Sequence, residues 1–104
     1  MGWTVGERGD AGSIFLYDQP LEGVYSNNWW GRAVHTGGSS QLDVHVTGEG
    51  KTVDFVGVFG MDCLNTSQSD WKSASNFGEP VSPAAMEDTV PGEALANARQ
   101  LFCK

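Results

Sequence analysis

The stretch Gln41-Leu42-Asp43-Val44-His45-Val46-Thr47 alternates apolar and polar residues without interruption, which predicts a β-strand with one buried face. Gly48-Glu49-Gly50-Lys51 follows directly and predicts a hairpin turn. The chain then returns through Val53–Met61, which is apolar at both odd and even positions, as in a central strand covered on both faces. These three segments predict an antiparallel hairpin at the centre of a β-sheet.

The position of the turn also predicts the register of this hairpin. It places Val44 opposite Phe55 on the buried face and His45 opposite Asp54 on the polar face. Together with Asp43, His45 and Asp54 could bind zinc or manganese, since an imidazole and two carboxylates would lie on adjacent strands. A solvated strand face with one His–Asp pair is the simpler explanation, so we expect no metal site there.

The rest of the chain favours short strands, one long loop and a helix at the end. Pro91 suits the first turn of a helix, and Leu95, Ala98, Leu101 and Phe102 would share its buried face. The expected elements are strands in Ser13–Tyr17, Val24–Tyr25 and Trp29–His35, a break at Gly37–Ser40, a loop over Asn65–Asp88 with a short strand around Ser75–Val81, and a helix over Pro91–Phe102. The expected core anchors of that loop are Trp71, Phe77, Val81 and Met86.

Length and composition indicate one small domain. The chain has 104 residues, of which 39% are hydrophobic, and we expect a single domain over residues 1–104. Its 14 glycines and 11% aromatic residues favour strands and turns over a helical bundle. We therefore predict an α+β fold that is mostly β, with an antiparallel sheet of about 4–6 strands, one C-terminal helix packed on it and one disulfide.

The charge of the chain excludes two classes of partner. Thirteen acidic residues against 6 basic ones give a net charge of −7, and no run of Lys or Arg occurs. Nucleic acid and anionic membrane surfaces would be repelled. No apolar stretch approaches the roughly 20 residues that span a bilayer. After these exclusions, a protein or a glycan remains as the possible partner. The charge does not indicate the oligomeric state.

The two cysteines predict one disulfide. Cys63 follows the predicted central strand and Cys103 is the penultimate residue, where a bridge would hold the chain end. Two buried free thiols are the alternative. A bridge indicates a periplasmic or extracellular protein. For such a protein we expect that the signal peptide has been removed, because Met1-Gly2-Trp3-Thr4 runs into polar residues without an apolar segment. The other explanation is a cytoplasmic protein that starts at Met1.

The arrangement of motifs around the cysteines points to a family. Asp62-Cys63 closes a strand, a stretch containing Trp and Pro follows, and Val90-Pro91-Gly92-Glu93 opens a helix that ends at Cys103. This layout resembles the surface-adhesin protein E-like family, mainly over residues 54–104. The resemblance implies a small exported bacterial protein without enzymatic activity, in which an antiparallel sheet packs on a C-terminal helix and two cysteines are bridged. Some members of that family bind host matrix proteins.

Catalytic motifs are missing from the sequence. His35 and His45 are its only imidazoles, and we expect His35 near Leu42, on the face opposite His45, so that they do not converge on a nucleophile. No nucleophile elbow, phosphate loop or dinucleotide fingerprint occurs, and Gly6-Glu7-Arg8-Gly9 lacks the spacing for any of them. We expect no catalytic residue and no cofactor. The competing class is a cytoplasmic small-molecule binding protein or enzyme.

Tryptophan supplies the candidate binding residues. Neighbouring strand residues point to opposite faces, so burying both Trp29 and Trp30 requires cover on both sides of the sheet. Either both belong to the core, or one is exposed and binds a protein or a glycan. The candidate binding residues are Trp29, Trp30, Trp71 and Asn28. The leading hypothesis is a non-catalytic exported bacterial interaction domain for a protein or another extracellular ligand, and a glycan-binding module is an alternative.

Overall fold

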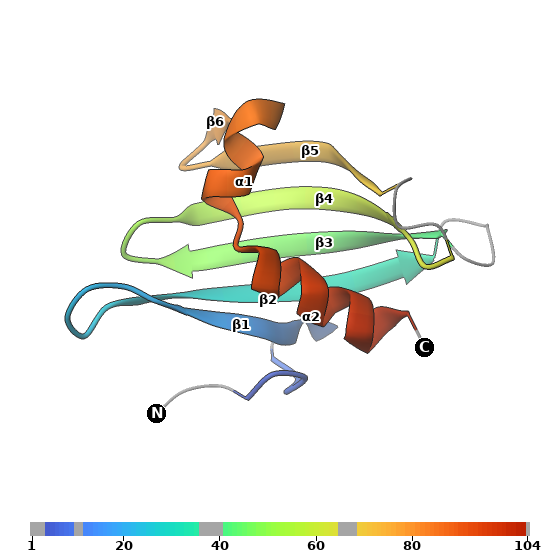
Figure 1. The fold of residues 1–104 in the computed structure, drawn as a ribbon, viewed down its shortest axis with the longest axis horizontal. Coiled ribbons are helices and arrows are strands. Elements are labelled where there is room, and N and C mark those ends of the chain that lie inside the picture. The colour runs from blue at the N-terminus through green and yellow to red at the C-terminus, as the bar shows by residue number, and fades with distance from the viewer. Residues whose placement is uncertain (1–3, 10–11, 36–40, 65–68, 104) are drawn as a thin grey trace.

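The computed structural model describes residues 4–9, 12–35, 41–64 and 69–103. Within this part of the chain, six strands form one antiparallel sheet in the order of the sequence, and helices lie on one of its faces (Figure 1). The elements are β1 (Ile14–Pro20), β2 (Ser26–His35), β3 (Gln41–Gly50), β4 (Asp54–Asp62), β5 (Asp70–Asn76), β6 (Glu79–Pro80), a 3-10 turn (Pro83–Ala85), α1 (Met86–Thr89) and α2 (Gly92–Phe102). The predicted fold class, mostly β with a C-terminal helix, is confirmed.

The core lies between α2 and the sheet. Ala94 and Ala98 are fully buried, and their small side chains let the helix approach β1 and β2 closely. Leu95, Leu101 and Phe102 are half-buried and pack against the same core, as the predicted helix face requires. The sheet contributes most of the core side chains, among them Leu16, Trp29, Val44, Val46, Phe55, Phe59 and Met61.

The register of the β3–β4 hairpin differs from the prediction. Val44 lies opposite Phe59, four positions beyond Phe55, and His45 lies opposite Val58. Because a shift by an even number of residues keeps every side chain on its face, Val44 and Phe55 are buried as expected. The cause is a later turn, since β3 continues to Gly50.

Two glycines that looked like turn residues belong to β3 instead. The Trp29 indole lies over Gly48, where a Cβ atom would be 2.6 Å from the ring, and Gly50 lies against Asn27. Glycine is needed here for the close approach of neighbouring groups. The chain reverses one step later, where the Gly50 amide donates a hydrogen bond to the Val53 carbonyl at 3.1 Å.

Among the described residues, the second face of the sheet is covered at the β1–β2 edge and exposed at Val56. Val56 in β4 is 57% exposed, so the prediction that this strand is buried on both faces is wrong at that position. Phe15 and Trp30 are buried on this side, and a Cβ on Gly9 would meet the Trp30 ring. The N-terminal segment is tied down by a hydrogen bond from Gly6 N–H to the Phe15 carbonyl, 2.8 Å long.

The predicted loop over residues 65–88 is wrong for most of its described length. Residues 70–76 form β5, which pairs along β4 with Ala74 opposite Gly57. A bulge between Val58 and Phe59 shifts the register, so Lys72 is the extra residue of β5. This bulge and the polar residues of β5 hide its alternation in the sequence. Residues 65–68 lie outside the described part of the chain.

The chain turns from β5 into β6 and then crosses to the helices. The turn residue Phe77 is 59% exposed, so it is not the core anchor that we expected. Met86 is buried and Val81 packs against the core, as predicted.

The predicted Cys63–Cys103 disulfide is present, with the two Cα atoms 5.4 Å apart. It joins the end of α2 to the residue that follows β4. None of the helices in the described ranges has both the length and the apolar character to cross a bilayer.

Candidate functional site

The tryptophan pair in β2 is buried, which excludes it as a binding surface. Trp29 is fully buried on the helix side and Trp30 is 8% exposed on the other side. Trp29 packs on Phe55 with ring centroids 5.4 Å apart, and Trp30 packs edge-on against Phe15 at 5.1 Å. The expectation that both belong to the core is therefore confirmed, and neither Trp29 nor Trp30 presents the exposed indole that the binding hypothesis required. The reason is that the N-terminal segment supplies the second layer of cover.

Asn28 also lacks the setting of a binding residue. It is half-buried in β2, opposite Asp18 on one side and Glu49 on the other. Its neighbour Asn27 is 1% exposed and donates from Nδ2 to Gln19 Oε1 at 3.0 Å and to Thr52 Oγ1 at 2.8 Å. These contacts join the end of β1, the start of β2 and the β3–β4 turn, and they give Asn27 a role in the fold that the sequence analysis missed.

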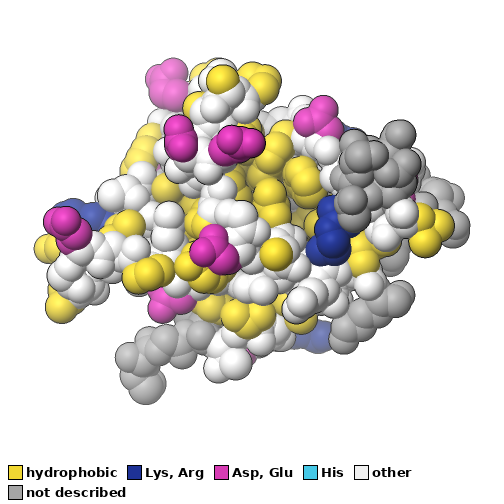
Figure 2. Space-filling view, in the orientation of Figure 1, with side chains coloured by type: hydrophobic (Ala, Val, Ile, Leu, Met, Phe, Trp, Pro, Cys, Tyr) yellow, Lys and Arg dark blue, Asp and Glu magenta, His cyan; other side chains and the backbone are white. Residues whose placement is uncertain are grey.

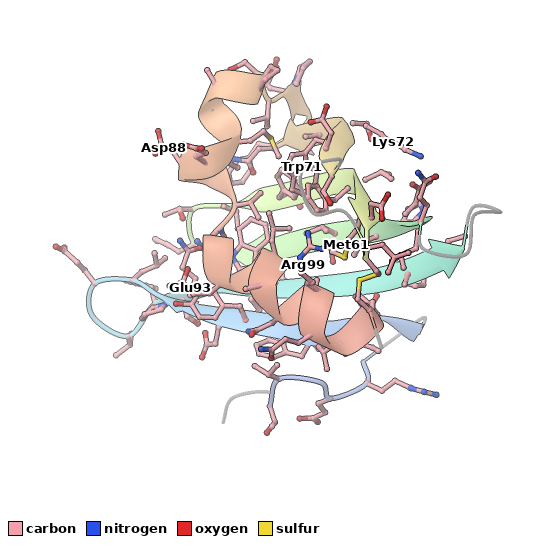
Figure 3. The ribbon with its side chains drawn as sticks, turned by 45° about the vertical axis from the view of Figure 1, so that its right-hand side comes forward. Met61, Trp71, Lys72, Asp88, Glu93 and Arg99 are labelled. Carbon is pink, nitrogen blue, oxygen red and sulfur yellow. A yellow bond between two sulfur atoms is a disulfide. The ribbon has the colours of Figure 1, made fainter. Side chains whose placement is uncertain are left out.

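Trp71, the remaining candidate, has the geometry of a binding residue. It lies in β5 near the open edge of the sheet and is half-buried. One part of its indole packs on Phe59 and Phe55, with ring centroids 5.0 Å and 5.5 Å away. In Figure 3, Trp71 lies on the side of the sheet that the helices cover, where Met61 lines the same hollow, while Lys72 points away. The indole is thus held rigidly and still reaches the surface.

Three surface hollows meet at Trp71. One of about 210 Å³ lies between β3, β4 and β5 and includes Met61 and Asp70. A second of about 320 Å³ follows β5, and a third of about 310 Å³ lies under α1 and the start of α2. We call the surface formed by these hollows the Trp71 groove; its apolar lining consists of Leu42, Met61, Trp71, Ala74, Val81, Pro83, Met86, Val90 and Leu95.

Acidic residues dominate the rim of the Trp71 groove. Asp62, Asp70 and Glu87 line it, and Figure 2 shows exposed hydrophobic surface on this face with several acidic side chains around it and basic side chain atoms at its right-hand border. The lining cation is Lys72, whose Nζ lies 2.7 Å from Asp43 Oδ1 and is therefore neutralised locally. The groove combines an apolar floor with a negative rim.

Arg99 stabilises one end of the groove. Its guanidinium donates to the Asp62 carbonyl and to Ser69 Oγ, at 3.3 Å each. Arg99 thereby links α2 to the end of β4 and to the residue before β5. Close by, Cys103 Sγ lies 3.5 Å from Met61 Sδ, so the disulfide also supports this end.

The residues considered for metal binding are not brought together. His45 is exposed opposite Val58, while Asp54 is paired with Glu49 at the far end of the hairpin. The register shift of four residues separates His45 from Asp54 along the strand. Over the described ranges, no three His, Cys, Asp or Glu side chains are grouped in a way that could hold a metal ion. His35 pairs with Leu42 in the β2–β3 ladder, the register position that the sequence predicted.

One ionisable group at the helix–sheet contact is perturbed. Burial raises the pKa of the Tyr17 phenol above its ordinary value of 10.0, and the nearby Glu93 carboxylate raises it further. The phenol donates a long hydrogen bond of 3.4 Å to Glu93 Oε2, between β1 and α2. Neither Tyr17 nor Glu93 lines the Trp71 groove, and the pair acts in the packing of α2 on β1.

Comparison of the chain with protein-family models, with curated proteins and with solved structures finds no match. The similarity to the surface-adhesin protein E-like family therefore stays a prediction from the sequence motifs.

The sequence analysis found Trp71 but missed its setting. Asp70, Lys72 and Glu87 were not chosen as site residues, because β5 and α1 were assigned to a loop. The Asp70-Trp71-Lys72 step, an aromatic residue between opposite charges in a polar segment, was the only local sign of this site.

Proposed function

We propose that the protein is a non-catalytic interaction domain of an exported bacterial protein, and that it binds a partner protein through the Trp71 groove. The observation that carries this proposal is Trp71 itself: a half-buried indole, fixed by two phenylalanines, at the meeting point of three surface hollows. Rigid aromatic anchors next to pockets are the usual energetic centres of protein interfaces.

The position of the hollows at the surface favours side chains of a protein over an enclosed small molecule. Pockets for small ligands have volumes of roughly 300–1,000 Å³ and enclose most of the ligand. The three hollows measure about 210, 320 and 310 Å³ and all lie at the surface. Each could accept one or two side chains of a partner. This argues against the alternative of a small-molecule binding protein or enzyme.

The charge of the groove defines the partner further. Asp62, Asp70 and Glu87 line it, and the protein as a whole carries a net charge of −7. Opposite charges on two surfaces increase both the rate and the specificity of association. We therefore expect a partner segment that carries apolar side chains flanked by Lys or Arg. A glycan stacked on Trp71 is the second candidate, and its lack of positive charge makes it the weaker one.

The compartment in this proposal rests on the disulfide. A bridge between Cys63 and Cys103 fits the periplasm or the extracellular space, because thiols in the cytosol are kept reduced. The resemblance to surface-adhesin protein E-like domains supports the same assignment and suggests a protein as the ligand.

Selection from a displayed library of linear peptides on the immobilised, oxidised domain tests the binding function. We expect the selected peptides to contain an aromatic or branched aliphatic residue close to Lys or Arg, and to lose binding to Trp71→Ala. Since removal of a large side chain could disturb the fold, Glu87→Lys is a second variant: Glu87 is exposed, so its charge reversal leaves the core intact.

Val24→Ala is the matched control, because Val24 is apolar and 94% exposed but lies in the β1–β2 turn. Peptides that bind Trp71→Ala and Glu87→Lys as well as the parent domain would contradict the proposed groove. Selection of no peptide, combined with quenching of Trp71 fluorescence by oligosaccharides, would favour the glycan-binding alternative.

A further inference from the structure

The outer edge of β5 is open for much of its length. Its inner edge pairs with β4, but on the outer side β6 pairs only with Ser75 and Asn76. One more contact follows, from the Val81 amide to the Ala74 carbonyl at 3.1 Å. In the described ranges, no strand pairs with the outer side of residues 70–73 (Figure 1). An edge with unpaired peptide groups is a template for another strand.

One of the three hollows runs along this same edge. It is lined by residues 70–74 on one side and by Val81, Pro83 and Met86 on the other, with a volume of about 320 Å³. A strand added to an edge lies about 4.8 Å from its neighbour, and its side chains alternate between the two faces of the sheet. Every second side chain of an added strand would therefore enter the hollow, next to Trp71.

We propose that the partner segment binds in an extended conformation, as an additional strand on the outer edge of β5. This inference rests on the function proposed above and specifies how its ligand is recognised. Hydrogen bonds to the backbone of β5 supply affinity, and the hollow selects apolar residues at alternate positions, as in other cases of strand addition.

The outward-facing backbone groups of β5 that are left for pairing lie near Lys72, because Ser73 alternates with Ala74 and turns its amide and carbonyl toward Val58 of β4. The Trp71 amide already donates to Asp70 Oδ1 at 2.8 Å, and the Ala74 carbonyl accepts from Val81. The bulge at Lys72 twists the strand locally, which restricts pairing to a short segment. We therefore expect only a few backbone hydrogen bonds, so that the hollow and the charges contribute much of the affinity.

The charges along this edge favour a basic strand. Asp70, Glu79 and Glu87 lie on β5, β6 and α1, and all three are exposed. Lys72 is the one basic residue of β5, and Asp43 neutralises it at 2.7 Å. A segment that alternates apolar residues with Lys or Arg matches both the hollow and these carboxylates, whereas an acidic segment of the same shape is repelled.

Synthetic peptides separate the strand from its side chains. The probes are a peptide of about eight residues, the length of an ordinary strand, in which lysine alternates with valine, and the same peptide with glutamate in place of lysine. Two further forms of the lysine–valine peptide carry N-methyl groups, one on every valine and the other on every lysine. In a strand, the amides of alternate residues point to the same edge, so each form blocks one edge and keeps all side chains.

Affinity for the oxidised, full-length domain is measured by calorimetry. We expect the lysine–valine peptide to bind and the glutamate–valine peptide to bind at least about tenfold more weakly. One N-methylated form should lose about tenfold or more in affinity, which corresponds to roughly 1.4 kcal/mol or more, while the other form keeps its affinity. Glu87→Lys should weaken the parent peptide, and Val24→Ala should leave it unchanged.

The outcomes distinguish this inference from the proposed function. Equal binding of all lysine–valine forms, together with loss of binding in Glu87→Lys and Trp71→Ala, would overturn strand addition and leave the Trp71 groove as the binding site. Absence of binding by every peptide, or binding that Trp71→Ala and Glu87→Lys leave unchanged, would overturn both.

Discussion

Replacement of Cys63 and Cys103 by serine should lower the free energy of unfolding by about 4 kcal/mol. The bridge spans 40 residues of sequence, and closing a loop of that length restricts the unfolded chain by about this amount in the chain-entropy model. A small domain has only about 5–15 kcal/mol of total stability, so the variant should fold with a much smaller margin. The midpoint of thermal unfolding should fall by roughly 15–30 °C.

The local effect of this replacement should be confined to the end of α2. The start of the helix keeps its contacts to the sheet, including a hydrogen bond of 2.6 Å from Asn97 Nδ2 to the Leu16 carbonyl. The last turn depends on the bridge and on the bonds from Arg99 to Asp62 and Ser69. Amide exchange should therefore speed up first in the last turn of α2, and last in the central strands β3 and β4.

Urea unfolding of the parent and of the serine variant, followed by circular dichroism, measures the difference. The parent protein treated with reductant and then alkylated is an independent control that should resemble the serine variant. A loss below about 1 kcal/mol, or exchange in the last turn of α2 that stays as slow as in the parent, would refute the reasoning. It would mean that α2 is held by its packing alone.

Three further predictions concern the sheet and its contact with α2. Gly48→Ala should destabilise the fold by about 1–3 kcal/mol, because the new Cβ would lie 2.6 Å from the Trp29 indole. Gly92→Ala is the control, because no atom lies within 4 Å of its Cβ. Equal urea midpoints for the two variants would contradict the close packing at Gly48. Asn27→Ala should cost about 1–3 kcal/mol through the loss of its buried hydrogen bonds; an unchanged free energy of unfolding would show that these bonds contribute nothing. Glu93→Gln should lower the pKa of the Tyr17 phenol, because it removes the negative charge beside it, although burial will still hold the pKa above 10.0. Because folding raises the pKa of the Tyr17 phenol, the neutral phenol stabilises the fold below pH 10.0, and this stabilisation is lost as the pH rises through the raised pKa. Spectrophotometric titration of the parent and the variant measures the pKa of the phenol. Identical curves would contradict the Tyr17–Glu93 contact.

The elements that the sequence predicted well have strong periodic signals. The alternation through residues 41–47 gave the buried face of β3, because one side of that strand packs on the core and the other meets water. The spacing of Leu95, Ala98 and Phe102 gave the packed face of α2. The position of Cys103 after this helix made the bridge to Cys63 the simplest arrangement of the chain end.

The errors arose where glycine or a bulge changes the meaning of a pattern. Gly48 indicates a turn in the sequence, but in the structure it makes room for the Trp29 indole. The bulge at Lys72 and the serines around it removed the alternation from β5. The candidate site depends on both β5 and the segment after it, so local sequence patterns pointed to Trp71 without showing what lies around it.

Chemical-shift mapping of the ¹⁵N-labelled, oxidised domain during titration with the lysine–valine peptide tests the Trp71 groove most directly. We expect the largest changes at the Trp71 indole and at the amides of β5 and of residues 81–87, which enclose the groove. The amides of His45 and Val56 on the open face of the sheet should remain unchanged. Changes concentrated on that open face or at the hairpin turn that carries Val24, with an unperturbed Trp71 indole, would contradict a partner-binding site in the groove.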